Sequence, residues 1–225
     1  MMKDEQLLRA TLHDAANQLA VVMAALELLG ENPLPRRISQ AQEAARQAGE
    51  LLQSAMTQAS PPPEAILADE ELGDSLALLR ATLGRGIRLD VLLGAEKQAL
   101  FLPRAQLHTT AVNLLLNARR ALDGKGRVSL VTENVSQDGR VYWAMTVTDN
   151  GPGVPADRRE AIFAPGGSFS PGGHGLGLSH SRAMARKAGG DLVLLPTEQG
   201  AGFRLLLPVD EGAAACYNES RMVGG

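Results

Sequence analysis

The chain has 225 residues, of which 44% are hydrophobic and 21% are charged, and its formal net charge is −3. This length and composition suit one large or two small globular domains and exclude a chain that is only a peptide or a disordered tail. Lysine and arginine form no clustered run, which nucleic-acid binding requires, so we expect no nucleic-acid partner. The single cysteine, Cys216, excludes an internal disulfide framework and favours a reducing compartment, the cytoplasm. Charged residues interrupt every apolar stretch before it reaches the roughly 20 residues of a membrane span, so we expect no membrane insertion.

The first 60 residues show the spacing of two amphipathic helices. Apolar residues recur three or four positions apart over residues 8–29 and again over 38–59, and the turn at 31–35 separates the two series. We therefore predict a helical hairpin over residues 1–60. Alanine fills much of the second series, so one hairpin buries little apolar area. We expect two hairpins to pair as the four-helix bundle of a homodimer.

The rest of the chain begins with a proline-rich segment and then changes its pattern. The prolines after Ser60 cannot continue a helix, so residues 61–68 are predicted to be a linker. Beyond the linker, helical and strand periodicities alternate, which predicts an α+β domain over residues 69–210 and a loose tail over 211–225. We expect helices at 70–83, 104–122 and 176–188, strands at 87–93, 99–102, 127–133, 141–148, 192–195 and 203–207, and a glycine- and proline-rich loop at 151–173.

The long predicted helix carries polar side chains that lie on one face. Asn113, Asn117 and Arg120 are spaced four and three positions apart, so their side chains point in similar directions. Amide oxygens are hard ligands that suit Mg²⁺, and a guanidinium group suits phosphate. An ordinary solvated polar face explains the same residues when this helix is considered alone.

Two glycine-rich segments follow. In the segment TDNGPGVP, Asp149 ends a predicted strand and can accept a hydrogen bond from an exocyclic amine, while Gly151 and Gly153 let the backbone approach a flat base. A tight turn is the alternative. The segment GGHGLGL at 172–178 opens the last helix, where bare backbone amides and the helix dipole favour a polyphosphate; a flexible hinge is the alternative.

In this order and at this distance, the three segments resemble the ATP-binding domain of the GHKL superfamily, which includes gyrases, heat-shock chaperones, mismatch-repair ATPases and histidine kinases. The resemblance covers residues 70–208 and implies a Bergerat-type α/β sandwich that binds ATP and Mg²⁺. It implies that Asn117 holds Mg²⁺ with help from Asn113, that Arg120 contacts phosphate and that Asp149 reads the adenine amine. It also implies that the walls of the nucleotide site are formed by Gly151, Gly153, Phe163, Gly173, Gly175, Leu176 and Gly177.

The segment LHDAANQL at 12–19 resembles the phosphoacceptor box of histidine kinases, whereas gyrases and chaperones have no such hairpin. The whole chain therefore resembles a sensor-type histidine kinase of a two-component system. The resemblance implies that His13 accepts the γ-phosphoryl group and that Asp14 holds the proton on the other imidazole nitrogen. It further implies that Asn17 orients a water during dephosphorylation of a partner, an additional phosphatase activity.

Three functions are compatible with this pattern. The favoured one is a cytoplasmic, homodimeric histidine kinase that phosphorylates His13 and passes the phosphoryl group to the receiver domain of a response regulator, with its signal from a sensor or signalling partner. The second is a histidine phosphotransferase that relays phosphoryl groups between receiver domains and keeps a vestigial ATP-binding fold, but the intact glycine and aspartate motifs favour the kinase. The third is a phosphatase or an anti-sigma-type ATPase, and the hairpin with His13 disfavours the anti-sigma version.

Overall fold

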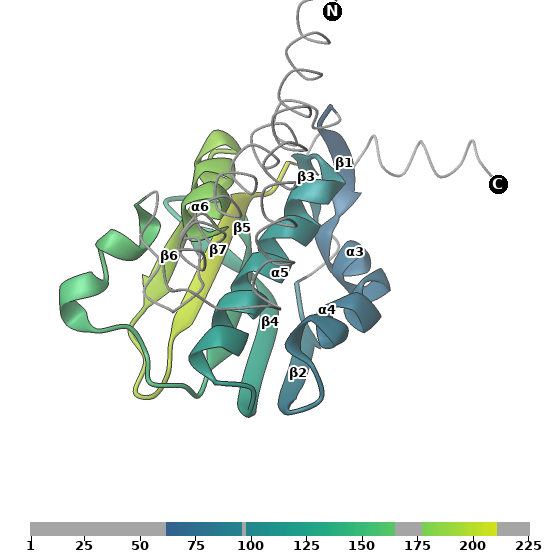
Figure 1. Cartoon of the computed structure of the whole chain (residues 1–225). Helices are drawn as coiled ribbons and strands as arrows, with labels where there is room; N and C mark the ends of the chain where they lie inside the picture. The colour runs from purple at the N-terminus through teal and green to yellow at the C-terminus, as the bar shows by residue number, and fades with distance from the viewer. Residues whose placement is uncertain (1–61, 96–97, 165–176, 211–225) are drawn as a thin grey trace, which may run out of the picture. The chain divides into compact units, whose positions relative to one another are not determined.

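The computed structural model of the chain describes residues 62–95, 98–164 and 177–210, and its elements are shown in Figure 1. The strands in chain order are β1 (Glu64–Leu67), β2 (Ile87–Leu93), β3 (Ala99–Leu102), β4 (Gly126–Gln137), β5 (Arg140–Asp149), β6 (Asp191–Leu195) and β7 (Gly202–Pro208). The helices are α3 (Ala68–Asp74), α4 (Leu76–Leu83), α5 (Arg104–Ala121) and α6 (Gly177–Lys187), with the short 3₁₀ helices η1 (Ala156–Arg158) and η2 (Ala161–Phe163). None of the helices in these residues is long and apolar enough to cross a membrane.

The strands form one large mixed sheet and one small sheet. The large sheet has the order β2-β4-β5-β7-β6, in which β2 and β4 run parallel and all other neighbours run antiparallel. The small sheet pairs β1 with β3. The order places the end of β5 between the start of β4 and the start of β7, because Asp149 lies opposite Val128 and Thr148 lies opposite Gly202. The connection before β4, the loop after β5 and the turn before β7 therefore meet at this end of the sheet.

The structure differs from the sequence prediction in the segment that follows the prolines. Residues 64–67, which were expected to belong to the linker, form strand β1. Glu64 lies opposite Leu102 and Leu67 lies opposite Ala99, so the strand is set by a partner far along the chain. Four residues carry too little local pattern to predict a strand, and only the pairing with β3 reveals it.

The predicted helix at 70–83 is also two helices rather than one. It breaks at Ser75, where α3 ends and α4 begins. The Ser75 hydroxyl lies 2.8 Å from Nδ1 of His108 on α5, and Nε2 of His108 lies 3.5 Å from a carboxylate oxygen of Glu71. These contacts hold the break between α3 and α4 against α5. Hydrophobic periodicity does not indicate such a contact, because His108 is far from Ser75 along the chain.

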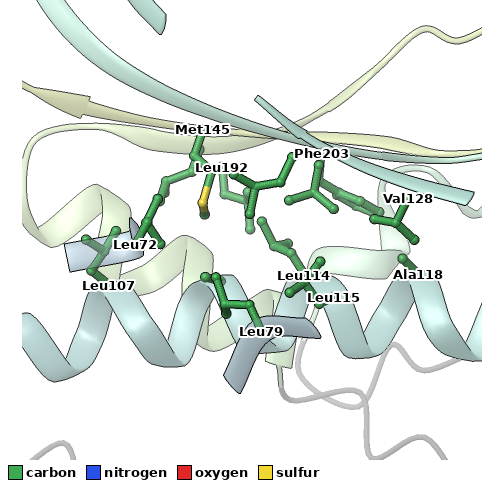
Figure 2. Packing of buried hydrophobic residues seen from close by; sticks show 14 of the residues in the cluster. Leu72, Leu79, Leu107, Leu114, Leu115, Ala118, Val128, Met145, Leu192 and Phe203 are labelled. Carbon is green, nitrogen blue, oxygen red and sulfur yellow. The ribbon is translucent and has the colours of Figure 1, made fainter. Parts of the chain in front are cut away.

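The core lies between the large sheet and the helices, which cover one of its faces (Figure 1). The strands contribute alternate residues and α5 contributes residues three or four positions apart, as expected for a strand and a helix that each bury one face. Figure 2 shows this packing, with side chains of α5 directed at those of the sheet. The fully buried residues include Leu107, Leu114, Leu115, Val128, Leu130, Trp143, Met145, Leu192 and Leu205. The apolar face of α5 thus leaves Asn113 and Asn117, both half-buried, beside the core.

A carboxylate at the start of α3 joins that helix to the sheet. One oxygen of Asp69 accepts a hydrogen bond from the indole N–H of Trp143 at 2.8 Å. The other oxygen accepts from the Thr132 hydroxyl at 2.9 Å and from the backbone N–H of Ala95 at 3.1 Å. Trp143 and Thr132 are each 1% exposed, so Asp69 provides acceptors for donors that water does not reach.

We predict that Asp69→Ala lowers the free energy of unfolding by roughly 3 kcal/mol, because it leaves buried donors without an acceptor. Urea unfolding followed by the fluorescence of Trp143, the single tryptophan, measures the effect. Asp74→Ala, which removes an exposed carboxylate from the same helix, is the control and should change stability little. Equal stability of the two variants would contradict the structural role given to Asp69.

Candidate functional site

Asp149 is a nearly buried carboxylate at the end of β5, with 7% of its surface exposed. Its Oδ1 atom accepts hydrogen bonds from the backbone N–H of Gly151 at 2.8 Å and from the backbone N–H of Ala201 at 3.3 Å. Both hydrogen bonds that the described residues give to the carboxylate go to Oδ1, which leaves Oδ2 to accept one from a ligand. Burial raises the pKa of Asp149, and the two backbone hydrogen bonds counteract this rise in part.

Glycines shape the loops around this carboxylate. A Cβ atom at Gly200, in the turn between β6 and β7, would lie 1.7 Å from the backbone oxygen of Asp149. A Cβ atom at Gly153 would lie 2.7 Å from the backbone oxygen of Gly200, and one at Gly151 would lie 2.8 Å from Oδ1 of Asp149. Gly153 and Gly200 also have positive φ angles, 77° and 73°. Only residues without a side chain allow these two loops to approach so closely.

The sequence alone does not indicate that Gly200 belongs to this site. It lies in the turn QGAG between two short strands, where a glycine is common for reasons unrelated to function. Its role depends on contact with Asp149, which is far away along the chain.

A cavity of about 270 Å³ opens beside the same two loops. Its wall consists of residues 151–154 after β5, Arg159, Leu194 and Leu195 of β6, and residues 197–201 of the following turn. Val154 packs against the hydrophobic core, so the cavity borders both polar backbone and apolar side chains. This combination suits a flat, partly polar ligand.

The asparagines of α5 lie near α6. The Nδ2 atom of Asn113 donates a hydrogen bond to the hydroxyl oxygen of Ser181 at 3.4 Å, and a Cβ atom at Gly177 of α6 would lie 3.4 Å from Cγ of Asn113. The Nδ2 atom of Asn117 is buried, and none of the described residues provides it with an acceptor. A buried amide nitrogen without an acceptor is unusual and points to an occupant that accepts its hydrogen bond. Arg120 is exposed in the last turn of the same helix.

Phe163, at the end of η2, is held by α6 and β7. Its ring packs edge-to-face on Phe203 with the centroids 6.3 Å apart, and the guanidinium carbon of Arg182 lies 4.4 Å from the Phe163 centroid. Arg182 also donates two hydrogen bonds to Asp191, at 2.9 and 3.2 Å. Burial tends to raise the pKa of Asp191, but hydrogen bonds from Arg182 and Arg186 lower it to about 2. The sequence pattern did not indicate this group around Phe163, because its members come from separate elements.

The structure thus brings together part of the predicted site. Asp149 ends β5 and is followed by Gly151 and Gly153, Asn113 of α5 lies beside Gly177 of α6, and Phe163 lies against α6. Asn117 and Arg120 lie on α5 as well. Six predicted residues lie outside the described residues: His13, Asp14, Asn17, Gly173, Gly175 and Leu176. The predicted helical hairpin and its dimer bundle lie outside them too. The buried carboxylate, the unpartnered amide and the glycine loops fit a ligand with an amino-bearing base and a charged end.

Comparison with known proteins gives a family and several relatives. Residues 103–211 match the family described as histidine kinase-, DNA gyrase B-, and HSP90-like ATPase. The adaptive-response sensory kinase SasA of Prochlorococcus marinus (strain MIT 9313) is 31% identical over 141 residues, which cover 60% of this chain and 37% of the relative. The sensor kinase CckA of Brucella abortus (strain 2308) is 28% identical over 226 residues, which cover 90% of this chain and 24% of the relative. The chain spans less than two fifths of either relative.

Solved structures show the same fold. A mycobacterial sensor histidine kinase, MprB, aligns with a TM-score of 0.55 and 24% identity over 65% of this chain and 97% of that chain. Full-length ShkA in complex with AMPPNP aligns with a TM-score of 0.61 and 18% identity over 91% of this chain and 45% of that chain. At such identities the likeness concerns the fold, and it confirms the α+β class predicted for this domain.

We predict that Asp149→Asn makes the protein more stable at pH 7. A raised pKa in the folded state means that folding disfavours the ionised carboxylate, and asparagine removes the charge while its oxygen still accepts the two backbone hydrogen bonds. The gain should shrink as the pH falls towards the ordinary pKa of 3.8, because the wild-type carboxyl of the folded state, whose pKa is raised, becomes protonated over this range and no longer buries a charge.

Thermal unfolding of both proteins at pH 7 and pH 4 measures this difference. Asp157→Asn is the control, because that carboxylate is exposed and its loss should leave the unfolding temperature nearly unchanged. A lower unfolding temperature for Asp149→Asn at pH 7 would contradict the expectation that burial of the charge destabilises the folded state.

Proposed function

Because residues 103–211 belong to the histidine kinase-, DNA gyrase B- and HSP90-like ATPase family, we propose that the chain is an ATP-dependent histidine kinase. It phosphorylates His13 and passes the phosphoryl group to an aspartate of a response regulator. The observation that carries the proposal is Asp149, whose buried carboxylate keeps Oδ2 for a ligand although its burial disfavours the ionised form. The free-energy cost of burying this ionised carboxylate is explained by a ligand that donates a hydrogen bond to Oδ2.

In this proposal, different residues bind different parts of the nucleotide. Asp149 accepts a hydrogen bond from the exocyclic amine of adenine, and the glycine loops allow the base to lie against the backbone. Asn117 and Asn113 present amide oxygens to Mg²⁺, and Arg120 pairs with phosphate. The buried Nδ2 atom of Asn117, which has no acceptor among the described residues, supports a nearby anion, because a phosphate oxygen of the nucleotide could accept its hydrogen bond. When bound, Mg²⁺ would neutralise charge on the phosphate oxygens.

The proposed phosphoryl transfer uses His13 as the nucleophile. One imidazole nitrogen forms a bond to the γ-phosphorus, the bond from that phosphorus to the bridging oxygen breaks, and ADP leaves. Asp14 holds the proton on the other imidazole nitrogen, which stabilises the positive charge that develops on the ring. Asn17, one helical turn beyond His13, would orient a water when the partner is dephosphorylated.

The relatives support a two-component setting. SasA and CckA are named sensory or sensor kinases, and ShkA was solved with AMPPNP, an analogue of ATP. We propose that the chain works in the cytoplasm as a homodimer through residues 1–60, with a response-regulator receiver domain and a sensor or signalling partner. The alternative of a histidine phosphotransferase with a vestigial ATP-binding fold is disfavoured, because such a protein would have no use for the buried Asp149 carboxylate.

We predict that Asp149→Asn weakens ATP binding roughly 10- to 100-fold, the usual effect of losing a hydrogen bond to a charged acceptor. The amide would direct N–H groups at the adenine amine in place of an acceptor oxygen. Calorimetric titration with ATP measures the change, and Asp157→Asn serves as the control. Unchanged affinity would remove Asp149 from the binding site, and the stability measurement above distinguishes loss of binding from unfolding.

We predict that His13→Ala abolishes labelling by γ-labelled ATP and Mg²⁺ but leaves the affinity for ATP unchanged. The wild-type label should be labile in acid and stable in base, as expected for phosphohistidine. A labelled His13→Ala protein would overturn the assignment of the phosphoacceptor. Nucleotide binding without any label in the wild type would favour a phosphatase or a partner-activated kinase, and absence of both would favour the phosphotransferase.

A further inference from the structure

Ser181 is a polar side chain in a place where an apolar one would be expected. It lies on the face of α6 that packs against α5, and it is fully buried, with an exposed fraction of 0%. Its buried neighbours on the same helix, Met184 and Ala185, belong to the hydrophobic core. A hydroxyl group in such surroundings destabilises the fold unless it has a hydrogen-bond partner.

The partner of Ser181 is Asn113. The Nδ2 atom of Asn113 donates to the Ser181 hydroxyl oxygen at 3.4 Å, across 68 positions of sequence. An asparagine amide has a donor end and an acceptor end that are nearly equal in shape, and only hydrogen bonding decides which way it faces. Because Nδ2 is directed at Ser181, the carbonyl oxygen Oδ1 is directed elsewhere.

The surroundings of Gly177 show which part of α6 is next to the Asn113 side chain. A Cβ atom at Gly177 would be 3.4 Å from Cγ and 3.5 Å from Oδ1 of Asn113, so the Asn113 side chain lies beside Gly177, where the described part of α6 begins. Backbone N–H groups at the beginning of a helix favour negative charge, as in a phosphate group. The Asn113 side chain is thus close to the end of α6 at which the phosphates of a nucleotide would be favoured.

The second asparagine is not restrained in this way. The Nδ2 atom of Asn117 has no acceptor among the described residues. Of the two amides on this face of α5, Asn113 is therefore the one whose Nδ2 atom is held by another side chain of the described residues.

We propose that Ser181 is a positioning residue that holds the Asn113 amide with its oxygen available to the Mg²⁺ of a bound nucleotide. This inference rests on the proposed function. If the amide turned over, its NH₂ group would face the cation and oppose binding, because an amide N–H carries partial positive charge. A residue that orients a metal ligand contributes to metal affinity without touching the metal.

The experiment compares binding of AMPPNP to wild type and Ser181→Ala by calorimetry, with Mg²⁺ and with EDTA. We expect Ser181→Ala to weaken binding roughly 10-fold in the presence of Mg²⁺, at the lower end of the effect of removing a partner of a metal ligand. Binding in EDTA should change little, since adenine recognition does not involve Ser181. Ser129→Ala, a serine on β4 in the large sheet, is the matched control and should bind as the wild type does in both conditions.

A second pair of variants separates orientation from packing. In an Asn113→Asp background, the carboxylate presents an oxygen whichever way it turns, so Ser181→Ala should cause little further loss of Mg²⁺-dependent affinity. A structural role would instead produce the same loss in both backgrounds, because the cavity left by the hydroxyl is the same. Ser181→Thr, which keeps the hydroxyl, should retain most of the Mg²⁺-dependent binding.

The inference is overturned if Ser181→Ala binds AMPPNP as the wild type does with Mg²⁺, if the loss is equal with Mg²⁺ and EDTA, or if the loss persists in the Asn113→Asp background. Unfolding followed by Trp143 fluorescence shows whether each variant is folded. A wild-type protein that does not bind AMPPNP under either condition would overturn the proposed function itself, and this inference with it, which distinguishes the two failures.

Discussion

The two loops at the candidate site are organised around one nearly buried carboxylate, that of Asp149, at the end of the central strand β5. A single oxygen of this group accepts from two backbone amides that belong to different loops. For both amides to reach it, the loop after β5 and the turn before β7 must approach within van der Waals contact, which requires glycine at positions 151, 153 and 200. The sheet order supplies the scaffold, because it places β4 and β7 on either side of β5.

Helix α5 combines a structural and a functional role in one element. Its apolar face fills the core beneath the sheet, as Figure 2 shows for Leu107, Leu114 and Leu115. Because the burial of that face fixes the rotation of the helix, the amides of Asn113 and Asn117 necessarily lie at its border, next to α6. The same packing that stabilises the domain therefore determines where the polar groups point.

Motifs with strong local patterns were predictable from the sequence. The helix over 104–122, the hairpin strands before and after Asp138 and the final helix have clear periodicity or turn residues, and the structure confirms them with shifts at their ends. The break at Ser75 and the strand β1 were not predictable, because each depends on a partner distant in sequence. The same holds for the Asp69 carboxylate and for the contact between Arg182 and Phe163.

By itself, the sequence determined the class of fold and the types of residue available for chemistry, since periodicity and motif spacing are local properties of the chain. Only the tertiary structure decided how far those residues are buried, which hydrogen bonds they make and how their side chains are oriented. Burial raises the pKa of Asp149, Gly200 approaches the Asp149 backbone, and Asn113 donates a hydrogen bond to Ser181. Each of these depends on segments that lie far apart along the chain. Burial and orientation depend on what surrounds a group in space, and no local pattern specifies this.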